Sequence, residues 1–105
     1  MATFLTLKDP DATGSWTIDW SDWLNGDTIS VSTWSVTANE SPIALSVTSS
    51  SIAADTSVSP NVSNQWATVV VTGGTEGVVY TLTNEVTDNN GYKDNNSISV
   101  RVRQQ

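Results

Sequence analysis

Hydrophobic and polar residues alternate with a period of two along most of this chain, and no segment has a convincing helical period. Residues 14–20, "GSWTIDW", show the pattern clearly, because Trp16, Ile18 and Trp20 alternate with polar neighbours and share one face. Such alternation is typical of strands with one covered face. It predicts strands at Phe4–Leu7, Trp16–Trp20, Ile29–Val36, Ile43–Val47, Trp66–Thr72, Val78–Val86 and Ile98–Val102.

Turn-forming residues separate several of these runs. Asp9-Pro10-Asp11 ends the first strand, since proline lacks an amide donor. "LNGD", Leu24–Asp27, contains an Asn-Gly pair, which favours the positive φ angles of a tight turn. "DNNGYKDNN", Asp88–Asn96, predicts a hairpin loop.

Two stretches break the alternation. Ile29 and Val31 are out of phase with Trp34 and Val36, so we expect a β-bulge near Ser32-Thr33 that returns both pairs to one face. Residues 48–64 are rich in Ser, Ala and Asn, and predict a long crossover with one weak strand at most.

About seven short strands in 105 residues indicate a single domain, residues 1–105, with an all-β fold. The spacing favours an immunoglobulin-like, antiparallel, Greek-key β-sandwich. Tyr80 follows the glycine-rich stretch "GGTEG" at the start of the penultimate strand. This position predicts a tyrosine corner, in which the hydroxyl bonds to backbone a few residues upstream.

The composition narrows the chemistry. Without histidine or cysteine, the chain cannot form a Ser-His-Asp triad, a Cys-His pair or a zinc-thiolate site, so we expect no enzymatic activity, no cofactor and no disulfide. The net charge of −7 disfavours nucleic acid and anionic membranes as partners. The N-terminal residues lack the pattern of a Sec-type signal, and no run of apolar residues is long enough to span a bilayer.

The carboxylates suggest two calcium candidates. "DPDATG", Asp9–Gly14, matches the start of a calcium loop, but the twelfth position is Trp20 rather than a bidentate glutamate. Asp88-Asn89-Asn90-Gly91 is similarly rich in oxygen ligands, but these residues favour a hairpin turn over a calcium site. For both stretches we favour solvated turns, and we expect no metal site. Nor does any pattern encode a cleft between Asp19 and Asp22.

The five tryptophans divide into two groups. Trp16, Trp20, Trp34 and Trp66 fall in strand runs and are expected to contribute to the core, together with Tyr80. Trp23 stands beside the "LNGD" turn, where its ring either closes one end of the sandwich or contacts a partner. A carbohydrate-binding sandwich is an alternative, and it requires two or more exposed, coplanar rings.

The chain also resembles a known family. "FLTLKDPDA", "TIDWSDWL" with "GDTI", and "VTGGTEGVVYTLTNEVTDNNGYKDNNSISVRV" are similar to small structural proteins of tailed bacteriophages, the fibre-tail adaptor group. The most specific pieces are Ile18–Leu24 and Gly73–Tyr80, and Thr48–Asn64 lies outside the resemblance. The resemblance implies an Ig-like, non-enzymatic virion protein, made in the host bacterial cytoplasm, that links tail and fibre components. Head decoration and neck proteins of the particle are alternatives.

Partners expected on this basis are other virion proteins and further copies of this chain. Arg101 and Arg103 share the solvent-facing side of the last strand, where they suit carboxylates of a neighbouring subunit or, equally, acids of this chain. The segments Phe4–Lys8 and Thr28–Thr33 and the Asp88–Asn96 loop are also expected to contribute. The candidate interface residues are Phe4, Trp23, Thr28, Asn90, Tyr92, Arg101 and Arg103.

Overall fold

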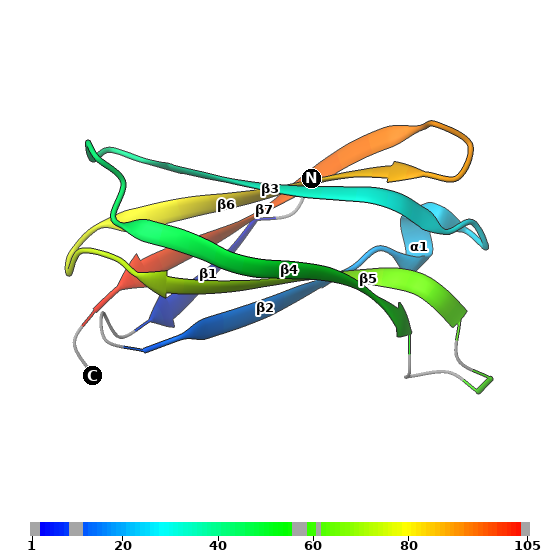
Figure 1. Ribbon diagram of the computed structural model, residues 1–105, viewed down its shortest axis with the longest axis horizontal. Helices are drawn as coiled ribbons and strands as arrows, with labels where there is room; N and C mark the ends of the chain where they lie inside the picture. The colour runs from blue at the N-terminus through cyan, green and yellow to red at the C-terminus, as the bar shows by residue number, and fades with distance from the viewer. Residues whose placement is uncertain (1–2, 9–11, 56–58, 61, 104–105) are drawn as a thin grey trace.

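The computed structural model describes residues 3–8, 12–55, 59–60 and 62–103, and it consists almost entirely of β-strands (Figure 1). Seven strands and one helical turn follow one another along the chain. They are β1 (Thr3–Lys8), β2 (Gly14–Asp19), α1 (Ser21–Leu24), β3 (Ile29–Ala38), β4 (Leu45–Asp55), β5 (Val62–Gly73), β6 (Val79–Asp88) and β7 (Lys93–Val102).

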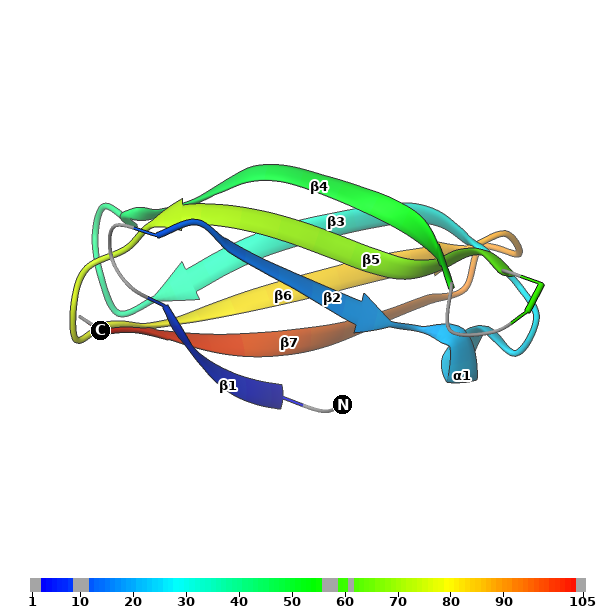
Figure 2. The ribbon, with the colours of Figure 1, turned by 90° about the horizontal axis from the view of Figure 1, so that it is seen from below.

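The strands form two sheets that pack face to face. One sheet has the order β1-β7-β6-β3 and the other has the order β2-β5-β4. In immunoglobulin lettering, β3, β6 and β7 correspond to strands C, F and G, and β2, β5 and β4 to B, E and D. This arrangement confirms the predicted Ig-like sandwich. One pairing departs from the prediction of an antiparallel fold, because β1 runs parallel to β7 along its edge (Figure 2).

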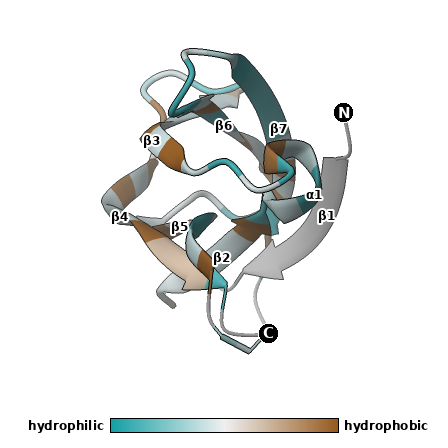
Figure 3. Ribbon diagram, turned by 90° about the vertical axis from the view of Figure 1, so that its right-hand side faces the viewer, coloured by the Kyte–Doolittle hydropathy of each residue, from teal (hydrophilic) through white to brown (hydrophobic). Residues whose placement is uncertain are grey.

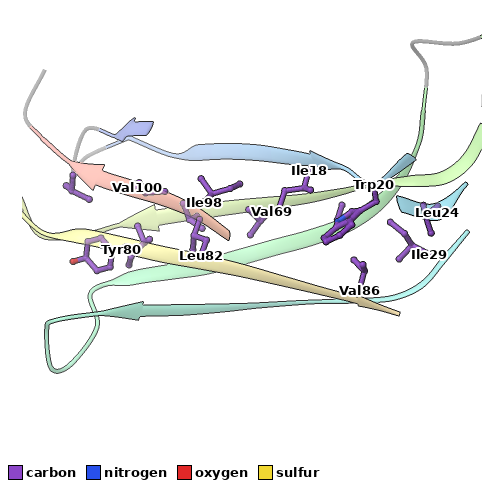
Figure 4. Close-up of a cluster of buried hydrophobic side chains, with 14 residues drawn as sticks. Ile18, Trp20, Leu24, Ile29, Val69, Tyr80, Leu82, Val86, Ile98 and Val100 are labelled. Carbon is purple, nitrogen blue, oxygen red and sulfur yellow. The ribbon is translucent and has the colours of Figure 1, made fainter. Parts of the chain in front are cut away.

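The core lies between the two sheets and is built from the alternating positions of β2, β5, β6 and β7 (Figure 4). Val69 and Val71 of β5 face Leu82 of β6 and Val100 of β7, and all four side chains are fully buried. Tyr80 lies toward one end of this core, while Trp20, Leu24 and Ile29 close the other. Burial of this apolar surface is the main force that holds the two sheets together.

The predicted bulge exists, but it lies earlier in β3. The register with β6 shifts between Ile29 and Val31, so Ser30 is the extra residue, and its hydroxyl donates to the carbonyls of Thr87 and Asp88. The shift returns Ile29 to the inner face shared by Trp34 and Val36 but leaves Val31 outside, 51% exposed. The prediction at Ser32-Thr33 was therefore wrong by about two residues.

The predicted crossover at residues 48–64 was also wrong. β4 continues to Asp55, and β5 begins at Val62. β4 is an edge strand whose backbone pairs with β5 through two irregularities, near Thr48 and Ala54. Residues 46–51 are exposed on both faces of β4, so this part of the strand lacks the hydrophobic alternation that marks strands with one covered face.

Candidate interaction surfaces

The helical turn α1 forms one end of the sandwich, which we call the turn end (Figure 3). The Asp19 carboxylate accepts the Ser21 N–H at 2.9 Å and so starts the turn. Asn25, in the left-handed conformation at φ 47°, ends it, and the Asp27 N–H closes the following turn on the Leu24 carbonyl at 3.0 Å. This local geometry buries Leu24 and leaves Trp23 partly exposed. The turn is too short to show a helical period in the sequence.

Trp23 packs on the end of the core. Its ring meets the ring of Trp20 edge-on, with centroids 5.5 Å apart and planes inclined by 69°. Such a T-shaped pair is a favourable arrangement for indoles. Trp23 thus closes the end of the sandwich while part of its surface stays accessible, which combines the two roles that the sequence left open.

The β6–β7 connection is a tight turn at the same end. Asp88 is buried, and its Oδ1 accepts the backbone N–H groups of Asn90 and Tyr92, both at 2.9 Å. The turn is shorter than the predicted loop, because Lys93 already pairs with Thr87. It presents Tyr92, whose side chain is 70% exposed. One of the two carboxylate oxygens of Asp88 is therefore engaged by the backbone.

Two hydrogen-bonded contacts join this turn to the segment after α1. The Asn89 side chain accepts the Thr28 N–H at 3.2 Å, and the Asn89 N–H donates to the Thr28 carbonyl at 2.9 Å. The Asn90 side-chain amide donates to Asp27 Oδ2 at 3.0 Å. Four of the seven predicted interface residues therefore lie at the turn end: Trp23 in α1, Thr28 after it, and Asn90 and Tyr92 in the β6–β7 turn.

The opposite end, which we call the corner end, is organised by Tyr80. Its hydroxyl oxygen accepts the Thr75 N–H at 2.8 Å, five residues upstream, and its proton goes to Glu40 Oε2 at 2.6 Å. The first bond has the geometry of a tyrosine corner. Glu40 also accepts from the Thr75 hydroxyl and from the Ala44 N–H. These donors, the Thr75 hydroxyl foremost, then Tyr80 and Ala44, lower the pKa of the Glu40 carboxyl.

Arg101 and Arg103 lie toward the corner end, on or just after β7. Both are exposed, and Val100 and Val102 between and beside them are buried. The sequence left open that the arginines pair with acids of this chain. Within the described part of the chain, neither guanidinium forms such an ion pair. In register, Arg101 lies opposite Val79 of β6, which is 46% exposed, and opposite Leu7 of β1. Phe4 is in β1 opposite Ile98, and its side chain lies outside the described residues.

The outer face of the β3-β6-β7 sheet carries many Ser and Thr side chains. Neighbouring strands align these side chains in rungs, one formed by Thr37, Thr81 and Ser99 and the next by Ser35, Thr83 and Ser97. Thr83 Oγ1 and Ser97 Oγ lie 3.0 Å apart. We call these six residues the hydroxyl face. All six side chains are uncharged; Glu85 on β6 and Arg101 on β7 lie beyond the two rungs, toward opposite ends of the sheet.

The tryptophans do not form a sugar-stacking platform. Trp20 is buried, and Trp16, Trp23, Trp34 and Trp66 are partly buried. Trp16 and Trp34 pack against the core as expected. The expectation for Trp66 was wrong: Gln65, Ala67 and Val69 set the inward phase of β5, so Trp66 points to the outer face. The run of valines hid this phase, because two successive valines occupy both faces.

The described residues contain no group of three or more acidic side chains arranged for a metal ion, and no pocket is found over them. The calcium candidate at Asp9–Asp11 lies outside the described residues. None of the helices in the described segments is long and apolar enough to cross a membrane. What the arrangement does offer is a rigid frame with two structured ends and an uncharged sheet face.

These features define an immunoglobulin-like β-sandwich that presents hydrogen-bonded turns at one end and exposed arginines toward the other. Comparison with family models identifies it further: the chain belongs to the family described as podophage GP4 fiber-tail adaptor protein gp77, which matches residues 8–101. The resemblance drawn from the sequence is confirmed, and the chain is a structural protein of the phage fibre-tail adaptor type. A comparison with curated proteins gave no match.

Proposed function

We propose that this protein is a non-enzymatic component of the phage particle that links tail and fibre components through protein–protein contacts. The observation that carries the proposal is the family match over residues 8–101, which names a fibre-tail adaptor. An adaptor needs at least two separate contact surfaces, one for each component that it joins. The sandwich has three candidates: the turn end, the corner end and the hydroxyl face.

The turn end supplies the aromatic contacts of this proposal. This end presents Trp23 and Tyr92. Tryptophan and tyrosine are enriched at protein interfaces, because each offers a large apolar area together with a polar group. The backbones of Trp23 and Tyr92 are held by α1 and by Asp88, so little conformational freedom is lost when a partner binds. The Asp27–Asn90 and Thr28–Asn89 contacts keep the two segments in one fixed arrangement.

The hydroxyl face supports a second contact. Thr and Ser hydroxyls are desolvated at lower cost than Lys or Glu side chains, and they exchange water for hydrogen bonds across an interface. A specific contact needs about 800 Å² from each partner. Two such contacts would cover roughly a quarter of the 5920 Å² accessible surface, which leaves room for neighbouring copies of the chain. Several copies arranged around a symmetry axis are part of the proposal.

Deleting the gene from the phage tests the linking role. We expect particles that lack fibres or tail parts and have lost infectivity, and complementation by the wild-type chain should restore both. Complete, infectious particles with fibres in place would contradict the proposal. Infectious particles that keep their fibres and lack only density on the head surface would indicate a head decoration instead.

Substitutions at the turn end sharpen this test. Tyr92→Ser changes an exposed side chain and should leave the fold intact while it weakens incorporation into particles. Ser50→Ala, which changes an exposed residue of β4 outside the three candidate surfaces, is the surface control. Equal incorporation of both variants would remove Tyr92 from the interface.

A further inference from the structure

The chain contains two Asn-Gly pairs, Asn25-Gly26 and Asn90-Gly91, and the structure treats them differently. Asparagine followed by glycine is the sequence most open to spontaneous deamidation, because glycine has no side chain to shield its backbone nitrogen. We propose that Asn25 is a site of non-enzymatic deamidation in the folded protein and that Asn90 is protected from the same reaction. The only co-reactant is water.

The reaction proceeds through a cyclic imide. The Gly26 nitrogen, having lost its proton to hydroxide, attacks Asn25 Cγ; a new C–N bond forms, the bond from Cγ to Nδ2 breaks, and ammonia leaves. Water then adds to one of the two imide carbonyls and breaks its C–N bond. Opening at one carbonyl gives aspartate and at the other gives isoaspartate, so the net change is the replacement of an amide NH₂ by a hydroxyl.

The backbone N–H of Asn25 donates to the Ser21 carbonyl at 3.1 Å, but among the described residues the two groups that react are free. The Asn25 side chain is exposed, and in the part of the chain that is described neither its side-chain amide nor the Gly26 N–H makes a hydrogen bond. Gly26 has open space around its Cα and adopts φ 96°, so it can follow a rotation of the Asn25 backbone. The bond that closes the turn is the single one from the Asp27 N–H to the Leu24 carbonyl.

Three hydrogen bonds hold Asn90 and Gly91 in place. The Asn90 Nδ2 donates to Asp27 Oδ2 at 3.0 Å, and the Asn90 N–H donates to Asp88 Oδ1 at 2.9 Å. The attacking nitrogen, that of Gly91, is committed to the Asp88 carbonyl at 3.1 Å. Two of these bonds, those of Asn90 Nδ2 and of the Gly91 N–H, have no counterpart at Asn25-Gly26 and must open before Gly91 can approach Asn90 Cγ. Asn90-Gly91 should therefore deamidate more slowly than Asn25-Gly26 in the folded state.

Deamidation of Asn25 changes the turn end. It places a negative charge between Asp22 and Asp27, which already make this end acidic. The isoaspartate product also inserts a methylene group into the backbone at the residue that ends α1, two residues after Trp23. The product should differ from fresh protein in the orientation of that end.

The test is to incubate the purified protein at mildly alkaline pH and to follow both peptides by mass spectrometry. Each extra hydrogen bond lowers the population of reactive conformations about five-fold, so Asn25 should react at least about tenfold faster than Asn90. In concentrated urea the two sites should react at similar rates, because only the fold distinguishes them. Equal rates in the folded protein, or an unreactive Asn25, would overturn the proposal.

Two variants separate the causes. Asp27→Ala removes the acceptor of the Asn90 amide and should accelerate deamidation at Asn90 several-fold, with the urea control unchanged. Asn25→Gln should abolish the mass increase at this site and leave Asn90 as slow as in the wild type. An Asp27→Ala protein whose Asn90 stays as slow as before, although Asn25 reacts, would show that the Asp27 contact does not protect Asn90.

Discussion

Trp20 donates its indole N–H to the side-chain oxygen of Asn84 at 2.9 Å, and both residues are buried between the sheets. The bond connects the end of β2, in one sheet, to β6, in the other. Asn84 is fully buried and also donates its amide to Ser32 Oγ at 2.9 Å and to the Thr33 carbonyl at 3.0 Å. In a sandwich without cysteine, this network ties three strands together with directional bonds.

Asn84→Leu should therefore be strongly destabilising. It leaves the Trp20 N–H without an acceptor and removes both donors to β3, which should lower the free energy of unfolding by roughly 2–4 kcal/mol. Urea unfolding measures the change, with the exposed Asn39→Leu as the control that adds the same side chain at the surface. A double-mutant cycle with Trp20→Phe should show coupling, and additive effects would mean that the bond contributes nothing.

Tyr80→Phe tests the corner. The substitution keeps the buried ring but removes the acceptor of the Thr75 N–H and the donor to Glu40, so we expect a loss of roughly 1–3 kcal/mol in the free energy of unfolding. Tyr92→Phe, at the exposed tyrosine, should leave the urea midpoint unchanged. Equal midpoints for Tyr80→Phe and wild type would exclude a stabilising role for the hydroxyl.

The lowered pKa of Glu40 predicts a pH-dependent contribution to stability. Because the pKa of the folded state lies below the ordinary value of 4.5, the carboxylate stabilises the fold fully above that value and loses its effect as the pH falls through the folded pKa. Unfolding in urea at a series of pH values should show a difference between wild type and Glu40→Gln that shrinks below about pH 4.5. A difference between wild type and Glu40→Gln that stays constant over the pH series would contradict the linkage.

Two glycines in the β5–β6 region give a matched steric test. Gly73 and Gly77 have similar positive φ values, 83° and 86°, so alanine is strained by a similar amount at each. A Cβ at Gly73 would lie 2.6 Å from the Ala44 carbonyl oxygen, whereas one at Gly77 meets nothing within 4 Å. Gly73→Ala should thus be more destabilising than Gly77→Ala by roughly 1–3 kcal/mol. Similar melting temperatures of the two variants would mean that the backbone at Ala44 moves away from the added Cβ without a measurable loss of stability.

The sequence predicts the fold well wherever one face of a strand is fully covered. Ile18 and Trp20, or Val100 and Val102, alternate with polar residues because their inner face is buried and their outer face is wet. Residues 46–51 of β4 are exposed on both faces and lack this contrast, so only the start of this strand was predicted, and its continuation to Asp55 was missed. The phase of β5 was also missed, since small Ala67 and polar Gln65 take the inward positions while Trp66 faces outward.

The polar network of the core was harder to foresee. Asn84 lies in phase with Leu82 and Val86, and a polar residue at an inward position is a usable signal of a buried hydrogen bond. Glu40 offered no such signal, because its partners Thr75 and Tyr80 are 35 and 40 residues away. Contacts of this kind depend on how the β3–β4 and β5–β6 connections meet, which local pattern does not encode.

The final prediction concerns the two arginines. Arg101 and Arg103 are exposed toward the corner end, and within the described residues they have no carboxylate partner, so they are available to a neighbouring subunit. Reversing both charges, Arg101→Glu with Arg103→Glu, should weaken incorporation into particles, whereas the free energy of unfolding of the isolated protein should stay within about 0.5 kcal/mol of wild type. Ser49→Glu with Ser51→Glu adds negative charge to the exposed part of β4, outside the candidate contact surfaces, and is the control. Normal incorporation of the double arginine variant would refute a docking role for this end, and equal losses for both variants would indicate a general effect of added negative charge.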